Sequence, residues 1–99
     1  MPYRDDETVL VRVFTRESRV ETKLEELAKL GFEGFTVLRA IAGYGTDGKP
    51  ASADIVIESL DLPVVVEFFT TYGKFKEREN LLKEIVPGLV TIERATLDP

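Results

Sequence analysis

The segment Gly43–Pro50 holds the residues of this chain that are best suited to binding a phosphate. Its sequence, GYGTDGKP, fits two glycine-rich phosphate patterns at once, GxGxxG and GxxxxGK. Both patterns work because the glycine turn opens a helix whose N-terminus faces the phosphates, and the second also needs a Ser or Thr hydroxyl for magnesium. Here Lys49 is followed by Pro50, and no amphipathic helix comes next. The segment therefore fits neither site, and two readings stay open: glycine N–H groups that approach an anion within reach of Lys49, or a connector that binds nothing.

The residues on either side of this segment predict two β-α-β halves. In the first half, apolar alternation predicts a strand over 8–15, and a further apolar, β-branched strand is expected over 35–42. Between them, a capping box at Ser18 and Glu21 predicts a helix that runs to a C-cap at Gly31. A loop of about ten residues over 46–54 follows. The second half is expected to hold a short strand over 54–58, a long strand over 63–69, a helix over 74–85 and a last strand over 89–97.

This order predicts an α+β fold, a ferredoxin-like βαββαβ sandwich in which two helices cover one face of an antiparallel sheet. The other face poses a problem, because a sheet face that meets water should be polar. Residues 64–66, Phe68 and Phe69 are apolar on both faces of their strand. We therefore expect another copy of the chain to cover the second face in a closed symmetric oligomer.

Length and composition narrow the classes of function. The 99 residues make one domain, and 43% hydrophobic residues suffice for a core. The chain has no Cys and no His, which excludes disulfides, thiolate nucleophiles, a Ser-His-Asp triad and the usual soft-metal ligands. A net charge of -5 with interleaved signs disfavours nucleic-acid binding. With no apolar run long enough to span a bilayer and a polar start over 1–7 that we expect to be flexible, a cytoplasmic location is the default.

Two segments resemble the PII signalling proteins. Residues 34–45, GFTVLRAIAGYG, resemble the family segment that begins Gly-x-Thr-Val and ends Gly-[Phe/Tyr]-Gly, where the second strand reaches the base of the mobile T-loop. Residues 62–67, LPVVVE, look like the Leu-Pro strand that follows the T-loop, with one residue fewer. The resemblance covers roughly residues 8–97 and is closest to the short PII-like branch.

The resemblance implies a homotrimer that binds an adenine nucleotide between subunits and engages a partner, such as a membrane transporter or an enzyme, through a T-loop-like loop over 44–54. It implies no turnover and no catalytic residue. Thr36 would lie beside the adenine, Gly43 and Gly45 along the phosphates, and Glu67 at the ribose or base edge. The implied nucleotide-binding residues are Thr36, Gly43, Tyr44, Gly45, Lys49, Glu67, Gly88 and Arg94.

Departures from the family pattern bear on the ligand. The loop between the second helix and the last strand has shrunk to 86–88, and the basic C-terminal tail is missing. The remaining candidate cations for a phosphate are Arg12, Arg39, Lys49 and Arg94. Fewer cations favour ADP or AMP over ATP, with cyclic AMP as a further option. Arg12 and Arg39 are equally suited to pair across the sheet with Glu58, Glu67 or Glu93.

Two alternatives stand beside the PII-like hypothesis. One is a divalent-metal trimer similar to CutA-type proteins, with oxygen ligands from Asp47, Asp54 and Glu58. The other is a small ferredoxin-like enzyme that works through carboxylates, for which no carboxylate pair has a suggestive spacing.

Overall fold

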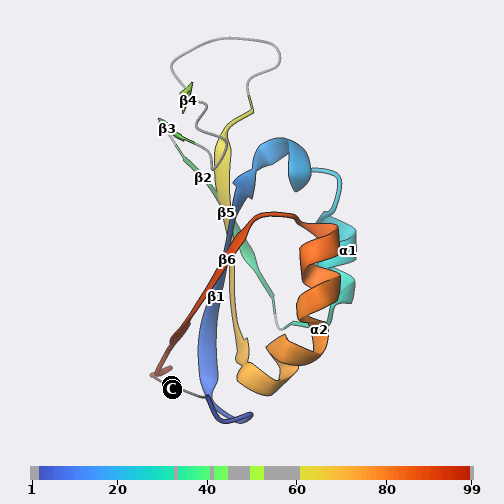
Figure 1. The fold of residues 1–99 in the computed structure, drawn as a ribbon, viewed down its shortest axis with the longest axis vertical. Coiled ribbons are helices and arrows are strands. Elements are labelled where there is room, and N and C mark those ends of the chain that lie inside the picture. Colours follow the sequence, from blue (N-terminus) through green and yellow to red (C-terminus); the bar gives the residue numbers. More distant parts are fainter. Residues whose placement is uncertain (1–2, 33, 41, 45–49, 53–60, 99) are drawn as a thin grey trace.

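The computed structural model describes residues 3–32, 34–40, 42–44, 50–52 and 61–98. Its elements, in chain order, are β1 (Thr8–Arg16), the 3-10 helix η1 (Glu17–Arg19), α1 (Leu24–Lys29), β2 (Thr36–Arg39), β3 (Ala42–Tyr44), β4 (Pro50–Ser52), β5 (Pro63–Thr71), α2 (Tyr72–Ile85) and β6 (Leu89–Arg94). The main sheet has the order β2-β5-β1-β6, and each neighbouring pair is antiparallel. Figure 1 shows both α-helices on one face of this twisted sheet. The predicted ferredoxin-like α+β fold is confirmed.

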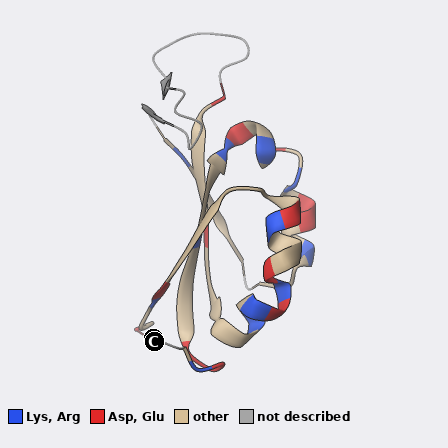
Figure 2. Ribbon diagram, viewed as in Figure 1, with Lys and Arg blue, Asp and Glu red and all other residues tan. Residues whose placement is uncertain are grey.

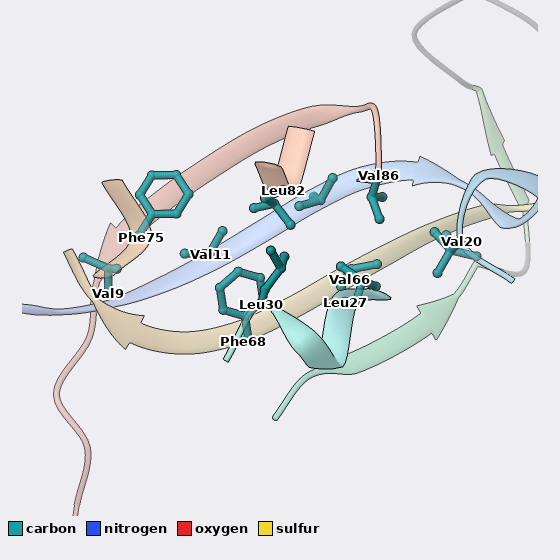
Figure 3. Close-up of a cluster of buried hydrophobic side chains, with 12 residues drawn as sticks. Val9, Val11, Val20, Leu27, Leu30, Val66, Phe68, Phe75, Leu82 and Val86 are labelled. Atoms are coloured by element: carbon teal, nitrogen blue, oxygen red, sulfur yellow. The ribbon is translucent and has the colours of Figure 1, made fainter. Parts of the chain in front are cut away.

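Strand alternation decides which face the helices cover. Val9, Val11 and Val13 of β1 are fully buried, and Val64, Val66 and Phe68 of β5 are nearly so. They pack against Leu27, Phe75 and Leu82 of the helices and against Leu30, which directly follows α1. Figure 3 shows this cluster between sheet and helices. The intervening strand residues therefore form the opposite face, which no element of the described chain covers.

The first helical region differs from the predicted single helix over 18–31. Ser18 does not cap a helix in this structure: its N–H donates to Asp61 Oδ1 at 2.9 Å and its hydroxyl donates to Asp61 Oδ2 at 2.7 Å. The chain is also tied here by the bond from Glu17 N to Leu62 O, 2.9 Å long. Held to the start of β5, residues 17–19 form only a 3-10 turn, and α1 begins at Leu24.

Part of the predicted 46–54 loop is ordered as a hairpin. β4, Pro50–Ser52, pairs antiparallel with β3, so that Tyr44 lies opposite Pro50 and Ala42 opposite Ser52. The predicted strand over 35–42 ends at Arg39 in the main sheet, and its last part belongs to this separate ribbon. The predicted strand over 54–58 lies outside the described residues.

The start of the chain is attached to α2. Tyr72 N donates to Glu7 O at 2.8 Å, and Gly73 N donates to Asp5 O at 2.9 Å. The rings of Tyr3 and Tyr72 stack with centroids 4.9 Å apart. Residues 3–7, which we expected to be flexible, thus extend the backbone hydrogen bonding at the N-terminus of α2. In the part of the chain that the structure describes, no helix is long and apolar enough to cross a membrane.

The turn between α2 and β6 is held by a buried hydroxyl, and this gives a first prediction. Thr15 is 8% exposed, and its Oγ1 donates to Pro87 O at 2.8 Å. Thr15→Val removes the hydroxyl donor and leaves the Pro87 carbonyl without this hydrogen bond, which should cost about 1 kcal/mol of stability. Thermal melting would measure the loss. Thr15→Ser keeps the hydroxyl, so it should melt nearer to the wild type, and equal melting of both variants would contradict this role.

Candidate functional site

The uncovered face of the sheet carries an apolar row across all four strands. Leu38, Val65, Phe14 and Leu89 lie opposite one another in the register. Phe14 is 39% exposed, Leu38 48% and Leu89 56%. Figure 2 shows that Lys, Arg, Asp and Glu are concentrated on the helices, whereas the strands are mostly tan. This apolar row is the feature expected of a face that another copy covers.

A groove opens beside this row, at the side of the sheet where β2 forms the edge. Its volume is about 430 Å³, which lies within the usual range for small-molecule sites. The lining residues are Leu10, Gly34, Phe35, Thr36, Glu67, Phe68, Phe69 and Leu97. We call this feature the open-face groove. It is mostly apolar and aromatic, with a hydroxyl and a carboxylate as its polar side chains.

Two residues singled out in the sequence meet in the open-face groove. Thr36 on β2 lies directly opposite Glu67 on β5. Both project from the uncovered face, because Val37 and Val66, the next pair, belong to the helix-covered side. A hydroxyl and a carboxylate on neighbouring strands can together bind a ligand group that donates hydrogen bonds, such as a ribose hydroxyl or the amino group of an aromatic base.

A charge cluster borders the groove. Arg12 on β1 donates from Nε to Glu67 Oε2 at 3.2 Å and from Nη1 to Glu93 Oε1 at 2.7 Å. The hydrogen bonds to Glu93 and then to Glu67 raise the pKa of the Arg12 guanidinium above its ordinary value. Of the two roles that the sequence left open for Arg12, this structure shows the pairing with carboxylates across the sheet. We call Arg12, Glu67 and Glu93 the charge cluster.

Other residues of the implied nucleotide site lie elsewhere in the chain. Gly43 and Tyr44 belong to β3, and Gly45 and Lys49 lie outside the described residues. Arg39 pairs with Glu17. Arg94 stands opposite buried Val9, where its Nε donates to Glu7 Oε2 at 2.7 Å and its guanidinium lies 4.3 Å from the Tyr3 ring centroid. Arg94 is therefore on the helix-covered face, and it does not line the open-face groove of its own chain.

Gly88 lies near the opposite end of β6 from Arg94, and it has a packing role. A Cβ at Gly88 would come within 2.4 Å of Phe14 O, a distance that real side chains do not adopt. The glycine thus lets the turn after α2 approach the backbone of β1. Gly88 also does not line the open-face groove of its own chain.

Six lining residues were not among the site residues predicted from the sequence, namely Leu10, Phe69, Leu97, Gly34, Phe35 and Phe68. For the first two a signal existed: Phe69 is two residues from Glu67 and so shares its face, and Leu10 is two residues from Arg12. Leu97 follows β6, and nothing in its local sequence indicates that the chain returns there to the groove.

The metal alternative receives no support from the described part of the chain, where no group of three or more acidic residues is placed to hold an ion. Asp47, Asp54 and Glu58, the candidate ligands, lie outside the described residues.

The sequence of the chain matches a known protein family. A family model matches residues 8–97, that of DUF190, described as "Uncharacterized ACR, COG1993". The chain belongs to the DUF190 family. Two UPF0166 proteins of Aquifex aeolicus (strain VF5) are similar to this DUF190 chain. One is 37% identical over 91 residues, covering 85% of this chain and 87% of the relative. The other is 35% identical over 75 residues, covering 75% and 72%.

Solved structures show that this DUF190 chain has the PII-like fold, as the resemblance implied. CPII, a nitrogen regulatory PII-like protein from Thiomonas intermedia K12 bound to ADP, AMP and bicarbonate, superposes with a TM-score of 0.64 at 15% identity. That match covers 91% of this chain and 87% of CPII. The GlnK–ATP complex of B. subtilis gives a TM-score of 0.61 at 14% identity, covering 93% and 84%.

Proposed function

We propose that this DUF190 protein is a PII-like regulator that binds an adenine nucleotide in the open-face groove and signals to a partner protein without turnover. ADP or AMP is the favoured effector, with cyclic AMP as a further option, and a transporter or an enzyme is the favoured class of partner. The expected cytoplasmic location remains part of this proposal. The observation that carries the proposal is the pairing of Thr36 with Glu67 in the wall of an apolar groove of about 430 Å³.

The chemistry of the groove suits the nucleoside part of the ligand. Phe35, Phe69 and Leu10 offer apolar and aromatic surface to a base. Glu67 offers carboxylate oxygens to ribose hydroxyls or to the amino group of adenine, and Thr36 offers a hydroxyl that can donate or accept. The PII-like neighbours bound to ADP, AMP or ATP add support from the same fold.

The phosphates would meet the chain that follows β2 in a neighbouring copy, because within one chain this segment comes after the end of β2 that lies away from the groove. That segment contains Gly43, Tyr44, Gly45 and Lys49, where glycine N–H groups and one ammonium are suited to an anion. Gly88 and Arg94 do not line the groove of their own chain, so in this proposal any contact from them comes from a second copy. A short phosphate chain fits this small set of cations, which is why we favour ADP or AMP.

Assembly is part of the proposal. The apolar row and the open-face groove share the uncovered face, so a second copy that covers the row would also wall the groove. We propose that three copies assemble in this way, each pair enclosing one nucleotide. The loop over 44–54 would then report the bound state to the partner.

A single substitution tests the nucleotide site. Glu67→Gln removes the carboxylate charge while keeping the shape, so ADP affinity should fall by about tenfold or more, as expected for a lost charge-assisted hydrogen bond. Calorimetric titration would measure the change. Glu77→Gln, on the exposed side of α2, is the matched control and should bind as the wild type does. Unchanged affinity in Glu67→Gln would place the nucleotide elsewhere.

A further inference from the structure

Arg12 stands between the open-face groove and strand β6. Its side chain is 36% exposed, and it contacts Glu67 on one neighbouring strand and Glu93 on the other. Glu67 lines the groove, but neither Arg12 nor Glu93 does. We propose that Arg12 is a positioning residue: it fixes the Glu67 carboxylate in the groove wall, and Glu93 anchors it in turn. This inference rests on the proposed function.

The register gives Arg12 this role. Arg12 lies directly opposite Glu67 on β5 and opposite Thr91 on β6, while Glu93 is two residues further along β6. The planar guanidinium reaches both carboxylates through different nitrogens, Nε for Glu67 and Nη1 for Glu93. Two strands are thereby joined to β1 through one side chain, and the Glu67 carboxylate is held by a donor from a neighbouring strand.

The charge balance of the cluster separates this role from phosphate binding. One guanidinium faces two carboxylates, so the charge cluster is net negative and repels a phosphate group. The bonds to Glu93 and Glu67 also hold the guanidinium in its charged form. Arg12 therefore acts on the nucleoside half of the ligand, through Glu67, and the phosphates lie away from it.

This assignment is tested by comparing ADP with adenosine. Arg12→Gln should weaken the binding of both by the same factor, about fivefold, because both ligands share the nucleoside that Glu67 contacts. ADP is titrated directly and adenosine by displacement of ADP in the calorimeter. Arg78→Gln is the matched control, because Arg78 is 35% exposed and pairs with Glu77 on α2. It should leave both affinities unchanged.

Two further variants separate positioning from a general structural effect. Arg12→Lys keeps a charge but cannot span two carboxylates in a planar fork, so we expect it to restore only part of the affinity. Arg12→Gln combined with Glu67→Gln should bind ADP no more weakly than Glu67→Gln alone, because Arg12 acts only through Glu67. If ADP affinity falls in Arg12→Gln while adenosine affinity holds, Arg12 is a phosphate ligand and the inference is wrong.

A failure of the proposed nucleotide binding can be distinguished from a failure of the positioning role of Arg12. If the wild type binds neither ADP nor adenosine, the nucleotide proposal fails, and the positioning of Glu67 is then read from thermal melting. In that case Arg12→Gln, Glu67→Gln and the double variant should all melt within a few degrees of one another, because each removes the Arg12–Glu67 ion pair and the additional loss of the exposed Glu93 contact in the Arg12 variants costs little. Additive decreases in the double variant would show that the two side chains act independently, and would overturn the inference.

Discussion

Gly88→Val should strongly destabilise the protein even when no ligand is present. A Cβ at this position would lie 2.4 Å from Phe14 O and 3.0 Å from Thr15 Cβ. The obstacle is backbone in the middle of the sheet, which cannot move aside as a flexible side chain can. We expect a loss of about 3 kcal/mol, which for a domain of this size lowers the melting temperature by roughly 12–24 °C. Differential scanning calorimetry of the ligand-free protein measures it.

Gly73→Ala is the matched control for this substitution. A Cβ there would meet Asp5 Cβ and Asp5 O at 3.1 Å, but Asp5 belongs to the N-terminal segment outside the sheet and can shift. The control should therefore melt within a few degrees of the wild type. If Gly88→Val keeps the wild-type melting temperature and loses only nucleotide affinity, the glycine serves the ligand and not the packing of β6 on β1.

Phe14→Glu should convert the assembled protein into single chains. Phe14 lies in the apolar row and is 39% exposed within one chain. In the proposed assembly three such rows meet, so each glutamate would be buried without a partner and close to its copies, a cost of several kcal/mol for each chain. Light scattering should show about three times the mass of one chain for the wild type and the mass of one chain for the variant.

Leu81→Glu controls for the introduced charge. Leu81 is 47% exposed, but it lies on α2, on the opposite side of the sheet from the apolar row. The control should keep the wild-type mass. Phe14→Glu should also lose ADP binding, because the groove would lack its second wall. A wild type that remains a single chain at assay concentrations would contradict both the assembly and the shared site.

The sheet was predictable from strand alternation and the order of the elements, whereas Thr36 and Glu67 were assigned to one site only through the resemblance to PII proteins. Strand alternation places Glu67 on the face away from Val64, Val66 and Phe68, and the order of elements makes β2 and β5 neighbours. The carboxylate pairing of Arg12 was one of two readings that the sequence left open. The strand register of the structure decides between the two readings, because it puts Arg12 directly opposite Glu67.

The features that the sequence did not reveal depend on contacts between distant segments. Ser18 and Glu21 form a correct capping pattern, but Asp61, far along the chain, takes both donors of Ser18 and the helix begins later. The packing role of Gly88 was not predictable, because its contact with Phe14 is invisible in the local sequence. β4 is three residues long and includes Pro50, so it carries no strand pattern of its own.

The most direct test of the account is a calorimetric titration of the wild-type protein with AMP, ADP, ATP and cyclic AMP, with and without magnesium. We expect saturable binding of one nucleotide per chain, with ADP or AMP tighter than ATP. Such binding would assign the open-face groove a ligand and rank the number of phosphates that it accepts. Absence of binding by all four nucleotides would contradict the proposed function, while the PII-like fold would stand.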